Sequence, residues 1–196
     1  MARPDWIAAL GAQSLGERVF AARRPRTTRE LAPPSAVQFI QFRFRRWDGP
    51  IGEWREHFGK GGGQVYSLDG KEPRRSCNEV EVAKRLQTIR DQAFWFSEYN
   101  PSSVPTIWQP WVRSLRGQTP TWLAVLDATV RQHVLSKRGG MPDVVAWSED
   151  EPLRSAIFIE CKGPREPVSE AQEDWIWAAQ RAGVELSQIA VSLRPF

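Results

Sequence analysis

The sequence predicts an α/β domain, and three observations lead to that class. Two short apolar stretches, 141–147 and 156–162, have the length and composition of buried strands. A segment with a helix-capping signature, 169–182, follows them. Upstream, residues 79–91 carry apolar side chains at helical spacing. Strands and helices therefore mix along the second half of the chain, and we expect a sheet with helices packed against it.

The first 77 residues give weaker signals. Apolar residues within 5–20 lie at roughly helical spacing and predict a short amphipathic helix. Residues 21–36 are rich in Arg, Pro and Thr, which is typical of a linker or an extended arm. Residues 37–44 alternate apolar and polar side chains and predict a strand. The glycine-rich segment 59–63 lacks the residue order of a phosphate-binding loop, and we interpret it as a flexible loop.

The signals sharpen from residue 78 onward. Asn78 is suited to cap a helix that begins at Glu79. Residues 93–99 predict a strand, and 100–120, with four prolines, predict irregular structure. Residues 122–135 have an ambiguous period, so a helix and a helix–strand passage both remain open.

The last elements follow a simple order. An acidic stretch, 148–154, separates the two apolar strands, which predicts a hairpin. Ser169 and Gln172 have the spacing of a capping box at the start of the next helix. Gly183 is expected to end that helix, and residues 189–193 form the last predicted strand.

Composition excludes several classes of protein. With 41% apolar residues, a 196-residue chain can bury a core, while its 26% charged residues argue against a membrane protein. The N-terminus lacks the pattern of a secretory signal. Cys77 and Cys161 are too few for a disulfide framework or a four-thiolate zinc site. We therefore expect a cytoplasmic protein with no membrane partner.

Charge is divided unevenly along the chain. The net charge is +4, but residues 1–78 hold 14 Lys and Arg against 8 Asp and Glu. A basic first half suits a nucleic acid, and a solvated face is an equally good interpretation. Aromatic and Arg residues alternate over 39–47, where contact with phosphates or bases competes with an amphipathic strand.

One group of residues has the side chains and spacing expected of a catalytic or metal-binding site. Asp143 begins one strand of the hairpin, and the partner strand ends with Glu160, Cys161 and Lys162. Because residues two apart share a face, Glu160 and Lys162 project together and Cys161 projects the other way. Carboxylates of Asp143 and Glu160, with the Cys161 carbonyl, suit a hard cation such as Mg²⁺, for which Mn²⁺ can substitute.

A metal at this place would activate a water and neutralise phosphate charge. Lys162 would then orient or deprotonate that water, or pair with developing negative charge. Each residue also has an ordinary interpretation. Asp143 is suited to strand entry, and Glu160 with Lys162 to an exposed charge pair.

In this order, the residues match the PD-(D/E)XK nuclease motif, with 16 residues between Asp143 and Glu160. The runs GGMPDVVAW, FIECKGP and VSEAQEDW more narrowly resemble the VRR-NUC branch, the virus-type replication–repair nucleases. The resemblance covers about residues 78–193. Cys161 departs from the β-branched residue usual in the family, but it is a small buried type in either case.

The resemblance implies a restriction-endonuclease-like fold, a central mixed sheet flanked by helices. It assigns 78–196 to the nuclease domain and leaves 1–77 as a basic N-terminal extension that could contact DNA. It implies metal-dependent cleavage of DNA, of branched or flapped substrates or in a defence or toxin role. A homodimer, or an immunity or assembly partner, would fit those roles. The alternative is a non-catalytic DNA-binding or assembly module that keeps the fold.

The family also has an acidic residue on an upstream helix, and Glu79 and Glu81 both qualify. Helical geometry directs Glu79 toward the apolar stripe and Glu81 toward solvent, so we predict Glu79 as a catalytic or metal-binding group. Stabilisation of the helix dipole is its other interpretation.

Gln172 has two interpretations: it closes the capping box, or it points into the site. The resemblance favours the second, as a catalytic residue, and leaves Ser169 as a cap. On the same helix, Trp175 and Trp177 lie on opposite sides, so at most one is expected to pack on the core. His57 and His133 show no ligand spacing and are expected to be structural or solvated.

Overall fold

The computed structural model describes residues 5–20, 35–42, 76–97, 106–114, 117–134, 140–163 and 165–193. Predictions for His57, for 21–34 and for the glycine-rich 59–63 lie outside these residues. The described strands are β1 (Gln13–Phe20), β2 (Ser35–Gln41), β3 (Gln92–Ser97), β4 (Val112–Ser114), β5 (Val144–Trp147), β6 (Ile157–Lys162) and β7 (Ile189–Leu193). The described helices are α1 (Asp5–Ala9), α3 (Ser76–Leu86), α4 (Thr121–His133), α5 (Pro152–Ser155) and α6 (Glu170–Arg181), with 3₁₀ turns η3 (Thr106–Trp111) and η4 (Leu186–Gln188).

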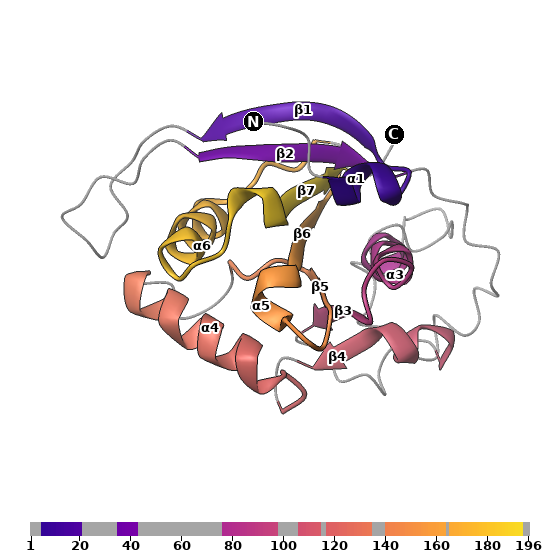
Figure 1. The fold of residues 1–196 in the computed structure, drawn as a ribbon. Coiled ribbons are helices and arrows are strands. Elements are labelled where there is room, and N and C mark those ends of the chain that lie inside the picture. The colour runs from indigo at the N-terminus through magenta and orange to yellow at the C-terminus, as the bar shows by residue number, and fades with distance from the viewer. Residues whose placement is uncertain are drawn as a thin grey trace, which may run out of the picture.

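The strands form one mixed sheet in the order β1-β2-β7-β6-β5-β3-β4. Helices α1 and α3 cover one face, while α4 and α6 cover the other (Figure 1). Consecutive residues of β6 alternate between these layers, so Ile159 and Cys161 join the core under α3 while Phe158 joins the core under α6. The α/β class and the mixed sheet flanked by helices are confirmed.

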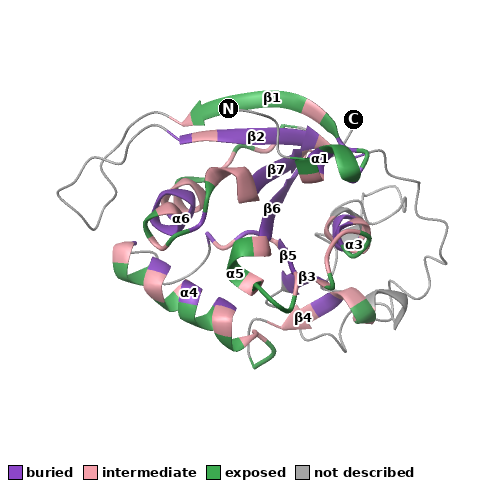
Figure 2. Cartoon of the chain, in the orientation of Figure 1, coloured by how far each residue is buried: buried purple, intermediate pink, exposed green. Residues whose placement is uncertain are grey.

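The N-terminal strands extend the same sheet. β1 pairs antiparallel with β2, and β2 pairs parallel with β7. Figure 2 shows β1 largely exposed and β2 largely buried. The division of the chain at residue 77 stays a prediction, but its first part supplies two strands to the sheet of the second.

The helix predicted over 5–20 is wrong beyond its first turn. α1 ends at Ala9, and the chain then passes through Gly11, at a φ of 64°, into β1. A left-handed backbone ends the helix at little cost because glycine has no Cβ. The spacing of apolar residues suggested a helix wrongly, because β1 is an exposed strand and lacks the alternation of apolar and polar residues that marks a half-buried strand.

β2 confirms the strand predicted over 37–44, although it spans Ser35–Gln41. It has no wet face, because its side chains pack into the core on both sides of the sheet. Phe39 is buried under α6, which leaves it no access to a nucleic-acid base. The remainder of the aromatic and Arg stretch, 43–47, lies outside the described residues.

Two predicted helix boundaries were inaccurate. α3 begins at Ser76 and ends at Leu86, so Asn78 lies inside it rather than at its cap. The N–H groups of Ile89 and Arg90 both donate to the Leu86 carbonyl, which closes a turn that leads into β3. The ambiguous segment 122–135 is a helix, α4.

The second half of the sheet matches expectation closely. β5 and β6 form the predicted antiparallel hairpin, with the short α5 in the acidic connection. α6 carries the predicted capping box of Ser169 and Gln172, and Gly183 follows it at a φ of 94°. β7 then pairs parallel with β6.

The expectation that only one tryptophan of α6 packs on the core is wrong. Trp175 and Trp177 are only 2% and 4% exposed because α6 lies between the sheet and α4. The Trp175 ring lies 5.3 Å from that of Phe158, and the Trp177 ring lies 6.3 Å from that of His133. Among the described residues, no helix is long and apolar enough to cross a membrane.

Candidate functional site

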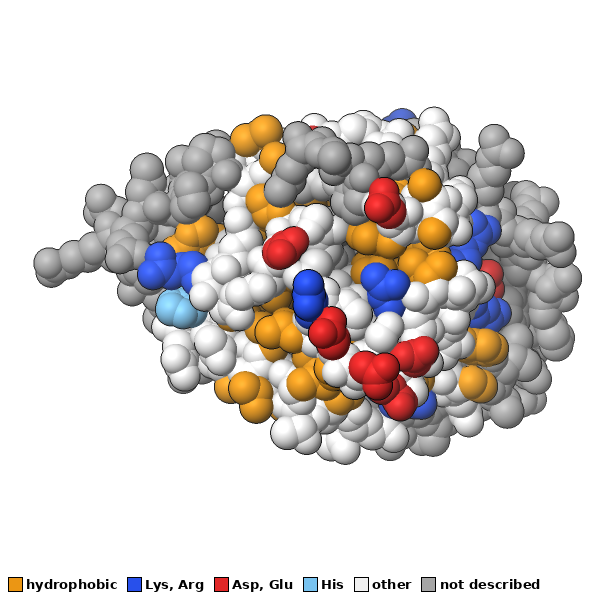
Figure 3. Space-filling model, in the orientation of Figure 1, with side chains coloured by type: hydrophobic (Ala, Val, Ile, Leu, Met, Phe, Trp, Pro, Cys, Tyr) orange, Lys and Arg blue, Asp and Glu red, His pale blue; other side chains and the backbone are white. Residues whose placement is uncertain are grey.

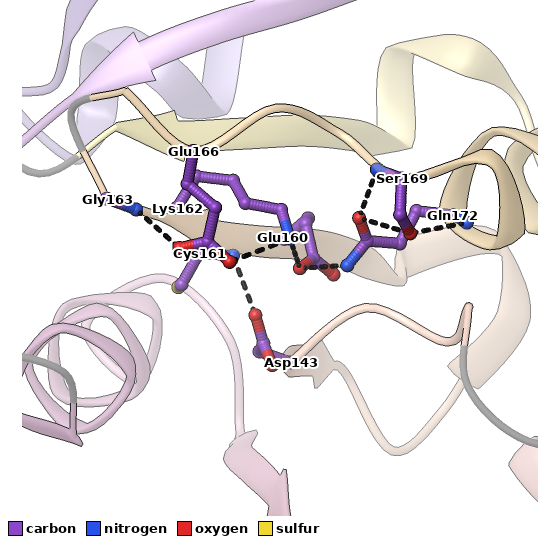
Figure 4. Close-up of polar contacts among 8 residues, drawn as sticks. All are labelled: Asp143, Glu160, Cys161, Lys162, Gly163, Glu166, Ser169 and Gln172. Carbon is purple, nitrogen blue, oxygen red and sulfur yellow. Dashed lines mark hydrogen bonds and ion pairs between the residues drawn. The ribbon is translucent and has the colours of Figure 1, made fainter. Parts of the chain in front are cut away.

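All of the predicted site residues except Glu79 meet where β5 begins and β6 ends (Figure 4). Asp143, directly before β5, is held at two atoms. Its Oδ2 accepts a 2.9 Å hydrogen bond from the Cys161 N–H, and its carbonyl accepts a 2.8 Å bond from the Phe96 N–H. Asp143 is therefore fixed between β3 and β6.

Glu160 and Lys162 form a buried ion pair on the α6 side of β6. They are 5% and 6% exposed, and Lys162 Nζ lies 3.0 Å from Glu160 Oε1. The interpretation of these residues as an exposed charge pair is therefore wrong. Charges are rarely buried to this degree unless they are paired, and keeping them buried carries a cost in stability.

Gln172 fulfils both of its interpretations because its amide has two ends. Its Oε1 accepts a 2.8 Å hydrogen bond from the Ser169 N–H, which closes the capping box. Its Nε2 donates a 2.5 Å hydrogen bond to Glu160 Oε1. The first turn of α6 thereby fixes a carboxylate oxygen of the site.

Glu166 is a member of the site that sequence reasoning missed. Its Oε1 lies 3.6 Å from Lys162 Nζ, and its Oε2 accepts a 3.2 Å hydrogen bond from the Gly163 N–H. The signal for it is local, since Glu166 follows Lys162 by four positions across a turn in which its own N–H donates to the Gly163 carbonyl. Arg165 in the same turn is exposed.

Negative charge exceeds positive charge in this group. Burial, and next the neighbouring Asp143, raise the pKa of Glu160 to about 9 despite the opposing charge of Lys162. Burial also raises the pKa of Asp143, with the Cys161 N–H acting against it. Two adjacent buried carboxyls therefore favour holding a proton between them until another positive charge replaces it.

Lys162 keeps its charge at neutral pH. Burial alone would lower the pKa of its ammonium, but Glu160 and then Glu166 and Asp143 outweigh burial and raise it. A lysine with a raised pKa holds its own proton at neutral pH, so almost no free amine is present to take a proton from water. Orienting a water and pairing with negative charge are therefore better supported roles than deprotonating that water.

Glu79 lies on the other side of β6. The Cys161 thiol is buried under α3, and its pKa is raised first by burial and next by Glu79. Glu79 Oε2 is buried, whereas Glu81 pairs with Lys84 at 2.8 Å on the outside of α3. Glu79 therefore faces Cys161, and Glu160 faces α6.

The acidic groups do not form a three-side-chain metal site. In the described ranges, no three His, Cys, Asp or Glu side chains are grouped so that they could hold an ion. What the structure brings together is Asp143 and Glu160, with Lys162, Gln172 and Glu166 around them. Two buried carboxyls with surplus negative charge, beside the Cys161 backbone carbonyl, fit a hard divalent cation by their donor chemistry.

A family model identifies part of the chain. The model of the VRR-NUC domain matches residues 109–192. This segment is similar to the VRR-NUC domain. It includes Asp143, Glu160, Lys162 and Gln172, and Glu79 lies before its first residue. The resemblance on which the site prediction rested is confirmed over that range.

Comparison with other proteins adds little. No curated protein matches the chain. Among solved structures, the crystal structure of paFAN1 bound to 2-nucleotide 5′-flap DNA with a gap matches with 15% identity and a TM-score of 0.34. The match covers 98% of this chain and 41% of that one, and a likeness this distant carries no inference about substrate.

Proposed function

We propose that the chain is a metal-dependent nuclease that hydrolyses phosphodiester bonds in DNA. The observation that carries the proposal is the buried pair of Glu160 and Lys162 beside the half-buried Asp143, within the segment that matches the VRR-NUC model. Buried charge with perturbed pKa values, placed at strand ends, is typical of a functional site. It also has a cost in stability that a purely structural strand would not need.

Each residue has a role that follows from its contacts. Asp143, Glu160 and the Cys161 carbonyl would hold the cation, which supplies an activated water and neutralises charge on the phosphate. Lys162, kept protonated, would orient the attacking water or stabilise the charge that develops on the phosphoryl oxygens. Gln172 keeps Glu160 in place, and Glu166 holds Lys162 from its other side.

The surface suggests the direction from which DNA approaches. Glu149, Asp150 and Glu151 are exposed at the connection between β5 and β6, beside α5, where Figure 3 shows acidic side chains gathered. Lys162 lies at the other end of β6. A strand of six residues is about 17 Å long, and this length separates Lys162 from the acidic connection. Phosphates are repelled at the acidic end. At the Lys162 end a bound cation would offset the surplus carboxylates, so DNA is expected to bind there.

The finer features of function are part of the same proposal. The basic residues of 1–77 would hold DNA while the VRR-NUC segment cuts it. From the family resemblance we also propose selection of branched or flapped DNA, or a defence or toxin role. A homodimer, or an immunity or assembly partner, would fit those roles. Cleavage of a panel of linear, flapped, junction and single-stranded substrates would measure substrate selection directly.

The test of the proposal is cleavage of plasmid and branched DNA in Mg²⁺, Mn²⁺ or EDTA. We expect cutting with either cation and none in EDTA, with loss in Asp143→Ala and Lys162→Ala. Asp150→Ala, an exposed acidic residue on the same hairpin, should cut like the wild type. Cutting that is unchanged by both site substitutions would refute the site.

The alternative is a DNA-binding or assembly module without catalysis. The retained charges argue against it, because a binding module gains nothing from burying Glu160 beside Asp143. DNA binding that persists in EDTA, with no cutting in Mg²⁺ or Mn²⁺, would favour the module.

A further inference from the structure

Gly140 lies three residues before Asp143 and packs against the first turn of α6. It is buried and has a φ of +99°, a conformation that L side chains rarely adopt. A Cβ at this position would lie 2.6 Å from the Ala171 carbonyl oxygen and 3.1 Å from the Trp175 Cβ. The first obstacle is backbone, so no side-chain rotation can relieve it.

The two sides of this contact carry different parts of the site. Ala171 precedes Gln172 in α6, and Gln172 holds Glu160. On the other side, Pro142 has a restricted φ and Asp143 is fixed at both its carbonyl and its carboxylate. The contact at Gly140 therefore couples the segment that leads into Asp143 to the turn that carries Gln172.

From this packing we infer that Gly140 is a positioning residue. The absence of a Cβ lets the first turn of α6 approach closely enough for Gln172 Nε2 to reach Glu160 Oε1. A methyl group at 140 displaces that turn and removes the hydrogen bond. The consequence for catalysis rests on the proposed nuclease function, whereas the consequence for the hydrogen bond does not.

The chain offers a matched control at the opposite end of the same helix. Gly183 has a φ of +94°, but a Cβ there would have nothing within 4 Å. Gly140→Ala and Gly183→Ala therefore impose similar backbone strain, and only the first adds a collision. Any effect confined to Gly140→Ala belongs to the contact with α6.

The direct test is the side-chain amide signal of Gln172 in a ¹⁵N–¹H spectrum. The short bond to a carboxylate should shift one Nε2 proton downfield, and Gln172→Ala assigns that signal. We expect the shift to disappear in Gly140→Ala and to persist in Gly183→Ala. A folded Gly140→Ala protein that keeps the shifted signal would overturn the inference.

Folding is controlled separately. If Gly140→Ala is largely unfolded by circular dichroism, the spectrum is recorded in trimethylamine N-oxide, which favours the compact state. A variant that stays unfolded even there would also overturn the inference, because Gly140 would then be needed for folding as a whole rather than for placing one turn.

Cleavage kinetics supply the second readout. Gly140→Ala should lower kcat by about 10- to 100-fold with KM changed less than about threefold, as expected for misplaced catalytic groups. Combining it with Gln172→Ala should add less than about twofold, because both remove the same hydrogen bond. Fully multiplicative losses would contradict the inference. A wild-type protein that cuts no DNA would refute the proposed function and leave the amide signal as the test of Gly140.

Discussion

Strands β2 and β6 both bury polar side chains, but they balance them differently. In β2, Gln38 is 8% exposed, donates a 2.7 Å hydrogen bond to Glu17 and accepts a 3.5 Å bond from the Ser14 hydroxyl. In β6, Glu160 and Lys162 are about equally buried, but both are ionisable groups. The neutral amide of Gln38 has its partners on the neighbouring strand β1, so it meets the demand of a buried polar group for hydrogen bonds.

The charged strand lacks that balance. Three carboxyl groups, those of Asp143, Glu160 and Glu166, act on the single ammonium of Lys162. Burial and the repulsion between Glu160 and Asp143 then raise the pKa of Glu160. β2 has no ionisable side chain and so has no such shift. A buried amide with all its hydrogen bonds made has a structural role. An excess of buried charge indicates a binding site, where a ligand supplies the balancing charge.

The largest expected effect is on the rate of DNA cleavage, which should depend on the polar residues of β6 and not on those of β2. Lys162→Met keeps the length of the side chain but removes its charge, and it should slow DNA cleavage by about 10²- to 10³-fold. Gln38→Leu removes the buried amide of β2 and should leave the cleavage rate within about twofold, since that group is structural. Initial rates on one plasmid, with circular dichroism to check folding, provide the measurement. Equal losses in both variants would remove the distinction.

The next effect is on stability and depends on pH. The pKa of Glu160 in the folded protein, about 9, lies above its ordinary value of 4.5, so the folded state binds this proton more tightly. Its contribution is complete below about pH 4.5 and is lost as the pH rises toward 9. Asp143, also raised, acts in the same direction. Lys162, raised from 10.5, loses its contribution only at still higher pH.

We therefore expect metal-free wild-type protein to lose roughly 5–10 °C in Tm between pH 5 and pH 9, relative to Glu160→Gln. Thermal unfolding in EDTA, followed by circular dichroism, measures this. Mg²⁺ should flatten the wild-type profile because a cation replaces the proton. Parallel profiles for the two proteins would contradict the charge excess assigned to β6.

The smallest effect tests how far the charged group extends through the sheet. Glu79→Gln should lower cleavage by about tenfold if Glu79 supports the site from the α3 side. Glu81→Gln, two residues away in the surface pair with Lys84, should change nothing measurable. Equal activity of the two variants would confine the site to the α6 side of β6.

Local signals predicted the second half of the fold well. The Ser169–Gln172 spacing placed the start of α6 correctly because a capping box is made within one turn of chain. The hairpin of β5 and β6 followed from two apolar runs with a polar connection. The grouping of Asp143, Glu160 and Lys162 followed from the two-residue period of a strand together with the family pattern.

What the sequence could not predict depends on tertiary neighbours. Trp177 is buried because α4 covers the outer side of α6. The residues near Trp177 in the sequence do not indicate that α4 packs there. β1 was mistaken for helix because an exposed strand needs little apolar pattern once β2 pairs with it. Glu166 reaches the site from a turn. A turn has no periodic spacing of side chains from which its direction could be predicted.

The sheet unites distant parts of the chain. β2 lies beside β7, and the Trp6 indole N–H donates a 2.8 Å hydrogen bond to the Ser187 carbonyl, 181 positions away. The β1–β2 pair can form early, since hairpins close in about 1–10 μs. It can dock only after β7 has left the ribosome, because β7 is its neighbour in the sheet. Contacts of such long range slow folding. During synthesis β6, which carries Glu160 and Lys162, lacks its neighbour β7 until α6 and β7 have followed it.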